Sequence, residues 1–122
     1  MPRMFDHLGL PVRDFVEARD WFHDRLGLEI EFEIPEAKTV ALKDRRDFAI
    51  LLSEGPVPAE PGRIGLWYQV DDVEAEHHAL AARGVDFVHG PKKTLWGYGA
   101  QLAEPNGYGV FLWDEASMKA KG

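Results

Sequence analysis

The stretch LPVRD at residues 10–14 returns as YQVDD at residues 68–72, and each copy leads into an apolar segment. Each copy ends in an aspartate, Asp14 or Asp72, a residue type that commonly caps the start of a helix. The helices expected after them end at Gly27 and Gly84, because glycine readily adopts the left-handed conformation that closes a helix. The chain is therefore predicted to contain the same structural unit twice.

The segments around each copy predict the order β-α-β-β-β. In the first half we expect strands at 5–10, 28–34, 39–43 and 48–53, with a helix at 15–26. In the second half we expect strands at 64–70, 85–88, 98–103 and 108–113, with a helix from 73 to about 83. The predicted fold class is α+β, with two tandem βαβββ units.

The segment between the two halves is rich in proline and glycine. Residues 54–62 hold three prolines and two glycines, as expected of a stiff linker. At 122 residues the chain is predicted to be a single domain, 1–122, made of modules at about 4–54 and 63–115.

The composition excludes several classes of function. The chain has 14 basic and 21 acidic residues, and its formal charge of −7 argues against nucleic acid and anionic membranes as partners. It has no cysteine, which excludes disulfides and thiolate chemistry. No apolar run has the length of a signal peptide core or a membrane span, so a soluble, cytoplasmic protein is expected.

Two βαβββ units, a histidine in the first strand, and WGY at 96–98 leading into EPNGY at 104–108 resemble the vicinal oxygen chelate superfamily. This family includes glyoxalase I, extradiol dioxygenases, fosfomycin-modifying enzymes and bleomycin-resistance proteins. The resemblance implies two curved mixed sheets that enclose a cleft, and a homodimer that shares its clefts between chains.

The resemblance also implies four positions for the ligands of a divalent metal, which here are His7, Leu51, Gly65 and Phe111. Only the imidazole of His7 can bind a metal, whereas a catalytic metal usually has about three protein ligands. We therefore predict no metal and no other cofactor, and divalent-metal glyoxalase or dioxygenase chemistry is the least favoured function.

Strand alternation predicts which side chains face the cleft. The predicted ligand-binding residues are Phe5, Leu51, Trp67, Gln69, Gln101, Phe111 and Trp113, with His7 as the candidate catalytic residue. Gly65, Gly99 and Gly109 are expected to leave room between the rings. In the alternative interpretation, the rings collapse into an ordinary core and His7 is a core residue.

Three further features bear on the charge of a ligand. Glu29, Glu31 and Glu33 are expected to share one face of a strand. This face either meets solvent, which is the favoured interpretation, or lines the mouth of the cleft, where it would favour a basic ligand. His89 lies in a loop that could approach the cleft. Lys92 and Lys93 beside Trp96 could bind an anion, although lysines in loops are usually solvated.

The favoured function is a metal-independent protein that binds an aromatic or cationic organic molecule in an aromatic cleft. The alternative is a metal-independent lyase or isomerase that uses His7 as an acid or base.

Overall fold

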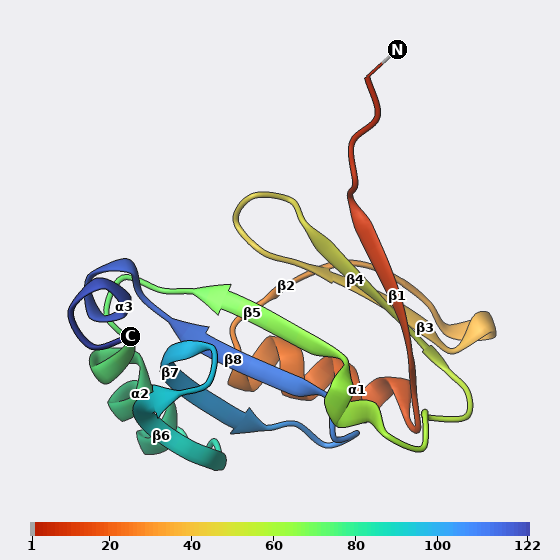
Figure 1. The fold of residues 1–122 in the computed structure, drawn as a ribbon. Coiled ribbons are helices and arrows are strands. Elements are labelled where there is room, and N and C mark those ends of the chain that lie inside the picture. The colour runs from red at the N-terminus through yellow and green to blue at the C-terminus, as the bar shows by residue number, and fades with distance from the viewer. Residues whose placement is uncertain (1) are drawn as a thin grey trace. The chain divides into compact units, whose positions relative to one another are not determined.

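The computed structural model describes residues 2–122, which form two compact units divided between Ala59 and Glu60 (Figure 1). Each unit contains one four-stranded mixed sheet with its strands in the order β-α-β-β-β along the chain. The predicted α+β class with two tandem βαβββ units is confirmed.

The first unit contains β1 (His7–Val12), α1 (Phe15–Asp20), a π-helical turn (Trp21–Arg25), β2 (Glu29–Ile34), a 3-10 turn (Pro35–Ala37), β3 (Thr39–Lys43) and β4 (Ala49–Glu54). Its sheet has the order β1-β4-β3-β2. β1 and β4 are parallel, and the other neighbours are antiparallel.

The second unit contains a 3-10 turn (Pro61–Arg63), β5 (Gly65–Gln69), α2 (Val73–Ala82), β6 (Phe87–Thr94), β7 (Gly97–Ala103), β8 (Gly109–Trp113) and α3 (Glu115–Lys121). Its sheet has the order β5-β8-β7-β6, with β5 and β8 parallel. Each sheet is therefore arranged in the same way, as the sequence duplication predicts.

The predicted helix ends are also confirmed. The Asp14 carboxylate accepts hydrogen bonds from the N–H groups of Val16 and Glu17, at 2.9 and 3.0 Å. Asp72 accepts one from Ala75 at 3.1 Å. Gly27 and Gly84 have φ angles of 82° and 86°, which side-chain-bearing residues rarely adopt.

Each sheet buries one face beneath its helices. α1 contacts β3 and β4, and α2 contacts β6 and β7. The buried residues on these faces include Leu10, Val12, Val40, Leu42, Ile50 and Leu52 in the first unit, and Leu66, Leu102, Val110 and Leu112 in the second. The predicted site residues that lie on these strands have the opposite parity, so they project from the other face of each sheet.

The first strand begins later than predicted. The pairing of β1 with β4 begins with His7 opposite Ala49, where β4 itself begins, and the carbonyl of Asp6 accepts from the N–H of Ala49 at 2.9 Å. Phe5, predicted as a strand residue, precedes the sheet and is 71% exposed. Its ring instead stacks on Phe48, with ring centroids 5.5 Å apart.

The prediction that Glu29, Glu31 and Glu33 share one face is wrong. A bulge between Ile30 and Phe32 leaves Glu31 as an extra residue without a partner on β3. The strand alternation therefore reverses at this point. The carboxylate of Glu33 contacts Arg19 of α1, at 3.3 Å, whereas that of Glu31 contacts His7.

Two further elements differ from the predictions. β6 extends to Thr94 through Gly90 and Pro91, because shifts in register around His89 accommodate the interruption on this edge strand. α3 was not predicted. Within the described residues, no helix has the length and apolar character needed to cross a membrane.

Candidate functional site

In the second unit, a row of four side chains crosses the face of the sheet that lies away from α2. Trp67 on β5 lies opposite Phe111 on β8, which lies opposite Gln101 on β7. Gln101 lies opposite His89 on β6. Since directly opposed residues project to the same face of a sheet, these four side chains share one surface.

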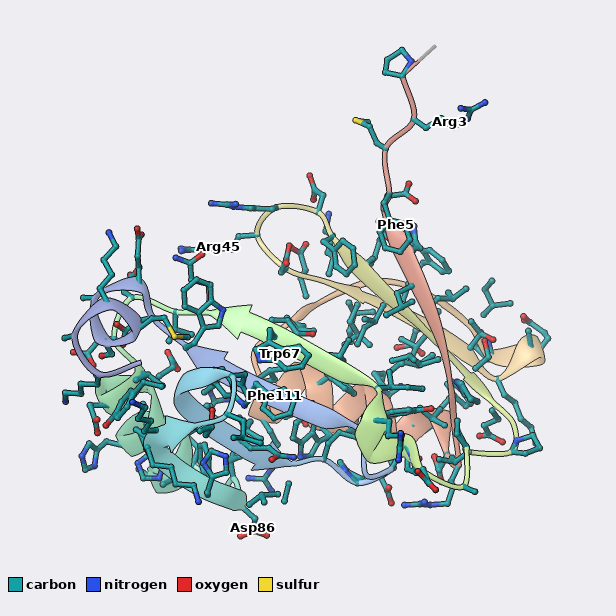
Figure 2. The ribbon with its side chains drawn as sticks, viewed as in Figure 1. Arg3, Phe5, Arg45, Trp67, Asp86 and Phe111 are labelled. Atoms are coloured by element: carbon teal, nitrogen blue, oxygen red, sulfur yellow. The ribbon has the colours of Figure 1, made fainter. Side chains whose placement is uncertain are left out.

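Three aromatic rings cover the β5 and β8 side of this surface. Trp67 stacks on Phe111, with ring centroids 4.4 Å apart and an interplanar angle of 18° (Figure 2). Trp96, in the turn between β6 and β7, contacts both rings edge-on, with centroids 6.1 Å from Trp67 and 5.6 Å from Phe111. We call Trp67, Trp96 and Phe111 the aromatic platform.

Residues 2–122 do not fully cover the aromatic platform. Trp67 remains 49% exposed, although its ring is large and apolar. The indole N–H groups of Trp67 and Trp96 have no hydrogen-bond partner among residues 2–122. The rings therefore form a surface on which a flat molecule can stack, rather than a filled core.

Glycines allow the rings to lie against the sheet. A Cβ atom at Gly65 would overlap the ring of Trp67, and one at Gly109 would come within 2.6 Å of Phe111 Cε2. A Cβ atom at Gly99 would overlap the ring of Trp96. The expectation that these glycines leave empty space between the rings is wrong, because the rings themselves occupy it.

A second row runs beside the first on the same face. Gln69 on β5 lies opposite Trp113 on β8, and Lys92 on β6 lies opposite Gly99 on β7. The side-chain amides of Gln69 and Gln101 form no hydrogen bond within the described residues. The structure thus brings five predicted ligand-binding residues together on one face: Trp67, Gln69, Gln101, Phe111 and Trp113.

The remaining predicted residues lie in the first unit. His7 and Leu51 project from the face of the first sheet that lies away from α1, two positions apart in the paired register of β1 and β4. Leu51 is half-buried there. Phe5 lies on neither sheet, so its predicted place on the face of a strand is wrong.

His7 is held between two carboxylates. Its Nε2 lies 2.8 Å from Glu31 Oε1, and its Nδ1 lies 3.2 Å from Asp6 Oδ1. Only the protonated ring donates from both nitrogens. The hydrogen bonds to Glu31 and then Asp6 raise the pKa of His7 above its ordinary value. The two carboxylates therefore stabilise the imidazolium cation.

The four positions that the family resemblance relates to metal binding do not fit a metal here. Leu51, Gly65 and Phe111 offer no side-chain donor atom, and Gly65 lies beneath the rings of Trp67 and Phe111. Both nitrogens of His7 face carboxylates. Across residues 2–122, no group of three or more histidine, aspartate or glutamate side chains is arranged to hold a metal ion.

Three residues on this face were not among the predicted site residues: Trp96, His89 and Lys92. Trp96 lies in a turn, where strand alternation says nothing about the direction of a side chain. His89 and Lys92 were expected in a loop but belong to β6. Their register with Gln101 and Gly99 could have been found only by extending that strand through Gly90 and Pro91.

Comparisons with known proteins agree with this arrangement of elements. The model of the Glyoxalase/Bleomycin resistance protein/Dioxygenase superfamily matches residues 4–112. The crystal structure of TnmS3, an antibiotic binding protein from Streptomyces sp. CB03234, is 26% identical, with a TM-score of 0.77 over 93% of this chain and 96% of that one.

Two other solved structures are similar. A glyoxalase/bleomycin resistance protein from Streptomyces sp. CB03234 is 29% identical, with a TM-score of 0.69 over 89% of this chain and 98% of that one. A superfamily member from Sphaerobacter thermophilus DSM 20745 shares the fold at 23% identity, with a TM-score of 0.75 over 93% of this chain and 98% of that one. No curated protein sequence matches the chain.

Proposed function

The chain belongs to the Glyoxalase/Bleomycin resistance protein/Dioxygenase superfamily, and we propose that it is a metal-independent binding protein for a flat aromatic organic molecule. The observation that carries the proposal is the exposed ring of Trp67, stacked on Phe111 and bordered by Trp96. Antibiotic binding by the similar protein TnmS3 supports a binding role of this kind.

The physical basis is stacking on a preformed surface. Each additional aromatic pair contributes about 0.5–1.5 kcal/mol beyond the burial of its area. The platform is already assembled, so little conformational freedom is lost when a ligand binds. The free amides of Gln69 and Gln101 provide hydrogen-bond donors and acceptors that can orient a polar substituent.

A titration followed by tryptophan fluorescence tests the proposal. We expect flat aromatic compounds to quench the emission of the wild-type protein at saturating concentration, and Trp67→Ala to weaken their binding about tenfold. Trp21→Phe is the matched control, because Trp21 lies in the first unit, outside the platform. Equal affinities for the wild type and Trp67→Ala would refute the proposal.

Metal independence is tested in the same titration. Dialysis against a chelator should leave the affinity for the ligand unchanged, because the family's metal positions carry Leu51, Gly65 and Phe111. Loss of binding after dialysis, with recovery on adding one divalent metal, would contradict this part of the proposal.

The second candidate function is a metal-independent lyase or isomerase that uses His7. The two carboxylates that favour the charged ring make His7 a proton donor rather than a base. Mass spectrometry of a bound compound after incubation distinguishes the two functions. A binding protein returns the compound unchanged, whereas the enzyme converts it and His7→Ala does not.

We also propose that the chain forms a homodimer, and that the protein acts in the cytoplasm. The dimer is implied by the family resemblance, and the unpaired edges of β1 and β5 support it.

A further inference from the structure

The face that carries the aromatic platform has an uneven distribution of charge. The strand register places thirteen residues on it: Gly65, Trp67, Gln69, His89, Lys92, Thr94, Gly97, Gly99, Gln101, Ala103, Gly109, Phe111 and Trp113. This set contains no aspartate or glutamate; Asp86, whose carbonyl accepts from Ala103 N at 2.9 Å, borders it just before β6, at the end away from Lys92. The absence is notable in a chain of formal charge −7, because most surfaces of such a chain carry carboxylates.

The basic groups on this face lie at its β6 edge. Lys92 lies opposite Gly99, next to the row that contains Gln101 and His89. Its ammonium group has no ion-pair partner within residues 2–122. By contrast, the ammonium groups of Lys43 and Lys119 lie 3.2 Å from carboxylates. Lys92 is therefore available to a ligand.

His89 contributes a second polar group at the same edge. Its Nδ1–H donates to the carbonyl of Gly90 at 2.8 Å, which leaves Nε2 facing no protein partner. Gln101 lies between His89 and Phe111 and has a free amide. Hydrogen-bonding groups thus lead from the aromatic platform to Lys92.

The dimensions suit a single small molecule. Adjacent strands are about 4.8 Å apart, so β6 lies about 10 Å from β8, measured across the sheet. A fused aromatic ring system stacked on Phe111 covers much of this distance, and the long side chain of Lys92 reaches over the rest. At the opposite, β5 edge, Gln69 lines a hollow together with Asp71, Glu115 and Lys119, and the last two form an ion pair with each other at 3.2 Å.

We infer that the ligand is an aromatic molecule with an anionic oxygen substituent, a carboxylate or a phenolate, which Lys92 binds while the rings stack on the aromatic platform. This inference rests on the proposed function and adds the charge of the ligand. It replaces the cationic class suggested by the sequence, since Glu29, Glu31 and Glu33 do not form a shared acidic face.

Three matched probes test the inference by isothermal titration calorimetry: naphthalene-2-carboxylate, naphthalene-2-carboxamide and 2-naphthylmethylammonium. They share one ring system and differ in charge. We expect the carboxylate to bind about tenfold more tightly than the carboxamide, as charge-assisted hydrogen bonds typically produce. The ammonium probe should bind most weakly.

Two lysine variants test which residue causes the preference for the carboxylate probe. Lys92→Met should remove the tenfold preference for the carboxylate over the carboxamide. Lys93→Met is the control, because Lys93 lies opposite Tyr98, whose hydroxyl donates to Glu74 of α2 on the helix side of the sheet. Both lysines are exposed, so neither change should impair folding.

The outcomes separate the two proposals. Equal binding of the carboxylate and carboxamide, tighter binding of the ammonium probe, or an unaltered preference in Lys92→Met would overturn the inference alone. If none of the three probes binds, the proposed stacking function fails, and the inference fails with it.

Discussion

Gly65 shows how a single missing side chain determines the shape of the aromatic platform. A Cβ atom there would overlap the Trp67 ring and lie 3.1 Å from Phe111 Cε2. Because the exposed indole can swing outward, Gly65→Ala should displace Trp67 at little cost to the fold. We expect a shift of tryptophan emission in the free protein and about fivefold weaker binding of aromatic probes, a loss of about 1 kcal/mol.

Gly9 provides the control for this substitution. It lies in β1 of the first unit, where a Cβ atom would meet only the Leu51 carbonyl oxygen at 3.9 Å, an ordinary contact. Gly9→Ala should therefore leave both emission and binding unchanged. Unaltered binding in Gly65→Ala would mean that the ligand does not use the Trp67 ring in this position.

The charge of His7 makes the stability of the protein depend on pH. In the folded protein, the pKa of His7 is raised above its ordinary value of 6.5. The ion pairs of His7 therefore make their full contribution to the free energy of unfolding below pH 6.5. This contribution is lost as the pH rises through the higher pKa. Urea unfolding between about pH 6 and 9 should show a larger decline for the wild type than for His7→Gln.

The difference between the two proteins isolates His7, since all other titrating groups are common to both. The exposed position of this ion pair makes the effect sensitive to salt. Parallel stability profiles for the wild type and His7→Gln, measured at low ionic strength, would contradict the role assigned to the two carboxylates.

At the scale of elements, a single buried carboxylate fixes two helices of the second unit. Asp114 caps α3 by accepting from Ser117 N at 2.6 Å, and it also accepts from Val73 N at the start of α2, at 2.7 Å. Loss of the cap typically costs about 1–2 kcal/mol, and a buried N–H without a partner costs about 1–3 kcal/mol. Asp114→Ala should therefore lower the free energy of unfolding by about 2–5 kcal/mol.

Chemical denaturation measures this loss of stability, and a substitution of the neighbouring carboxylate Asp71 serves as the control. Asp71 is exposed and forms no interaction with other residues in the described chain. Asp71→Ala should change the stability by less than about 0.5 kcal/mol. If both substitutions have equal effects, the two hydrogen bonds of Asp114 do not stabilise the helices as proposed.

The elements also show where sequence patterns succeed and fail. Apolar spacing and capping aspartates predicted both long helical segments, because these signals are local to the chain. The bulge in β2 could not be predicted, since an uninterrupted alternation at 28–34 gives no sign of an extra residue against β3. Gly90 and Pro91 suggested an early end to β6, but an edge strand tolerates both.

In the candidate site, too, some features could be predicted from the strand pattern and others could not. Strand parity placed Trp67, Gln101 and Phe111 on one face, because β5, β7 and β8 keep their register. It could not find Trp96, whose position depends on the conformation of a turn. It also could not show that the glycines would be covered by rings, because that outcome depends on side-chain rotamers.

At the scale of the molecule, the sheet of each unit has two edge strands, β1 and β2 in the first unit and β5 and β6 in the second. β1 and β5 are the corresponding strands of the two units, and each has a neighbour on one side only. Unpaired strand edges expose rows of hydrogen-bonding groups that readily pair with another chain. The residues before β1 add apolar surface, since Met4 is 88% exposed and Phe5 71%.

We therefore expect sedimentation velocity to show a homodimer at micromolar concentration, and Phe5→Asp to shift the population toward monomer. Burial of an aromatic side chain contributes about 1.5–3 kcal/mol, and a carboxylate in its place would oppose association. Leu95→Asp is the control, because Leu95 is a fully exposed apolar residue in the turn of the second unit. A monomeric wild type, or equal association of Phe5→Asp and the wild type, would show that the segment before β1 does not mediate self-association.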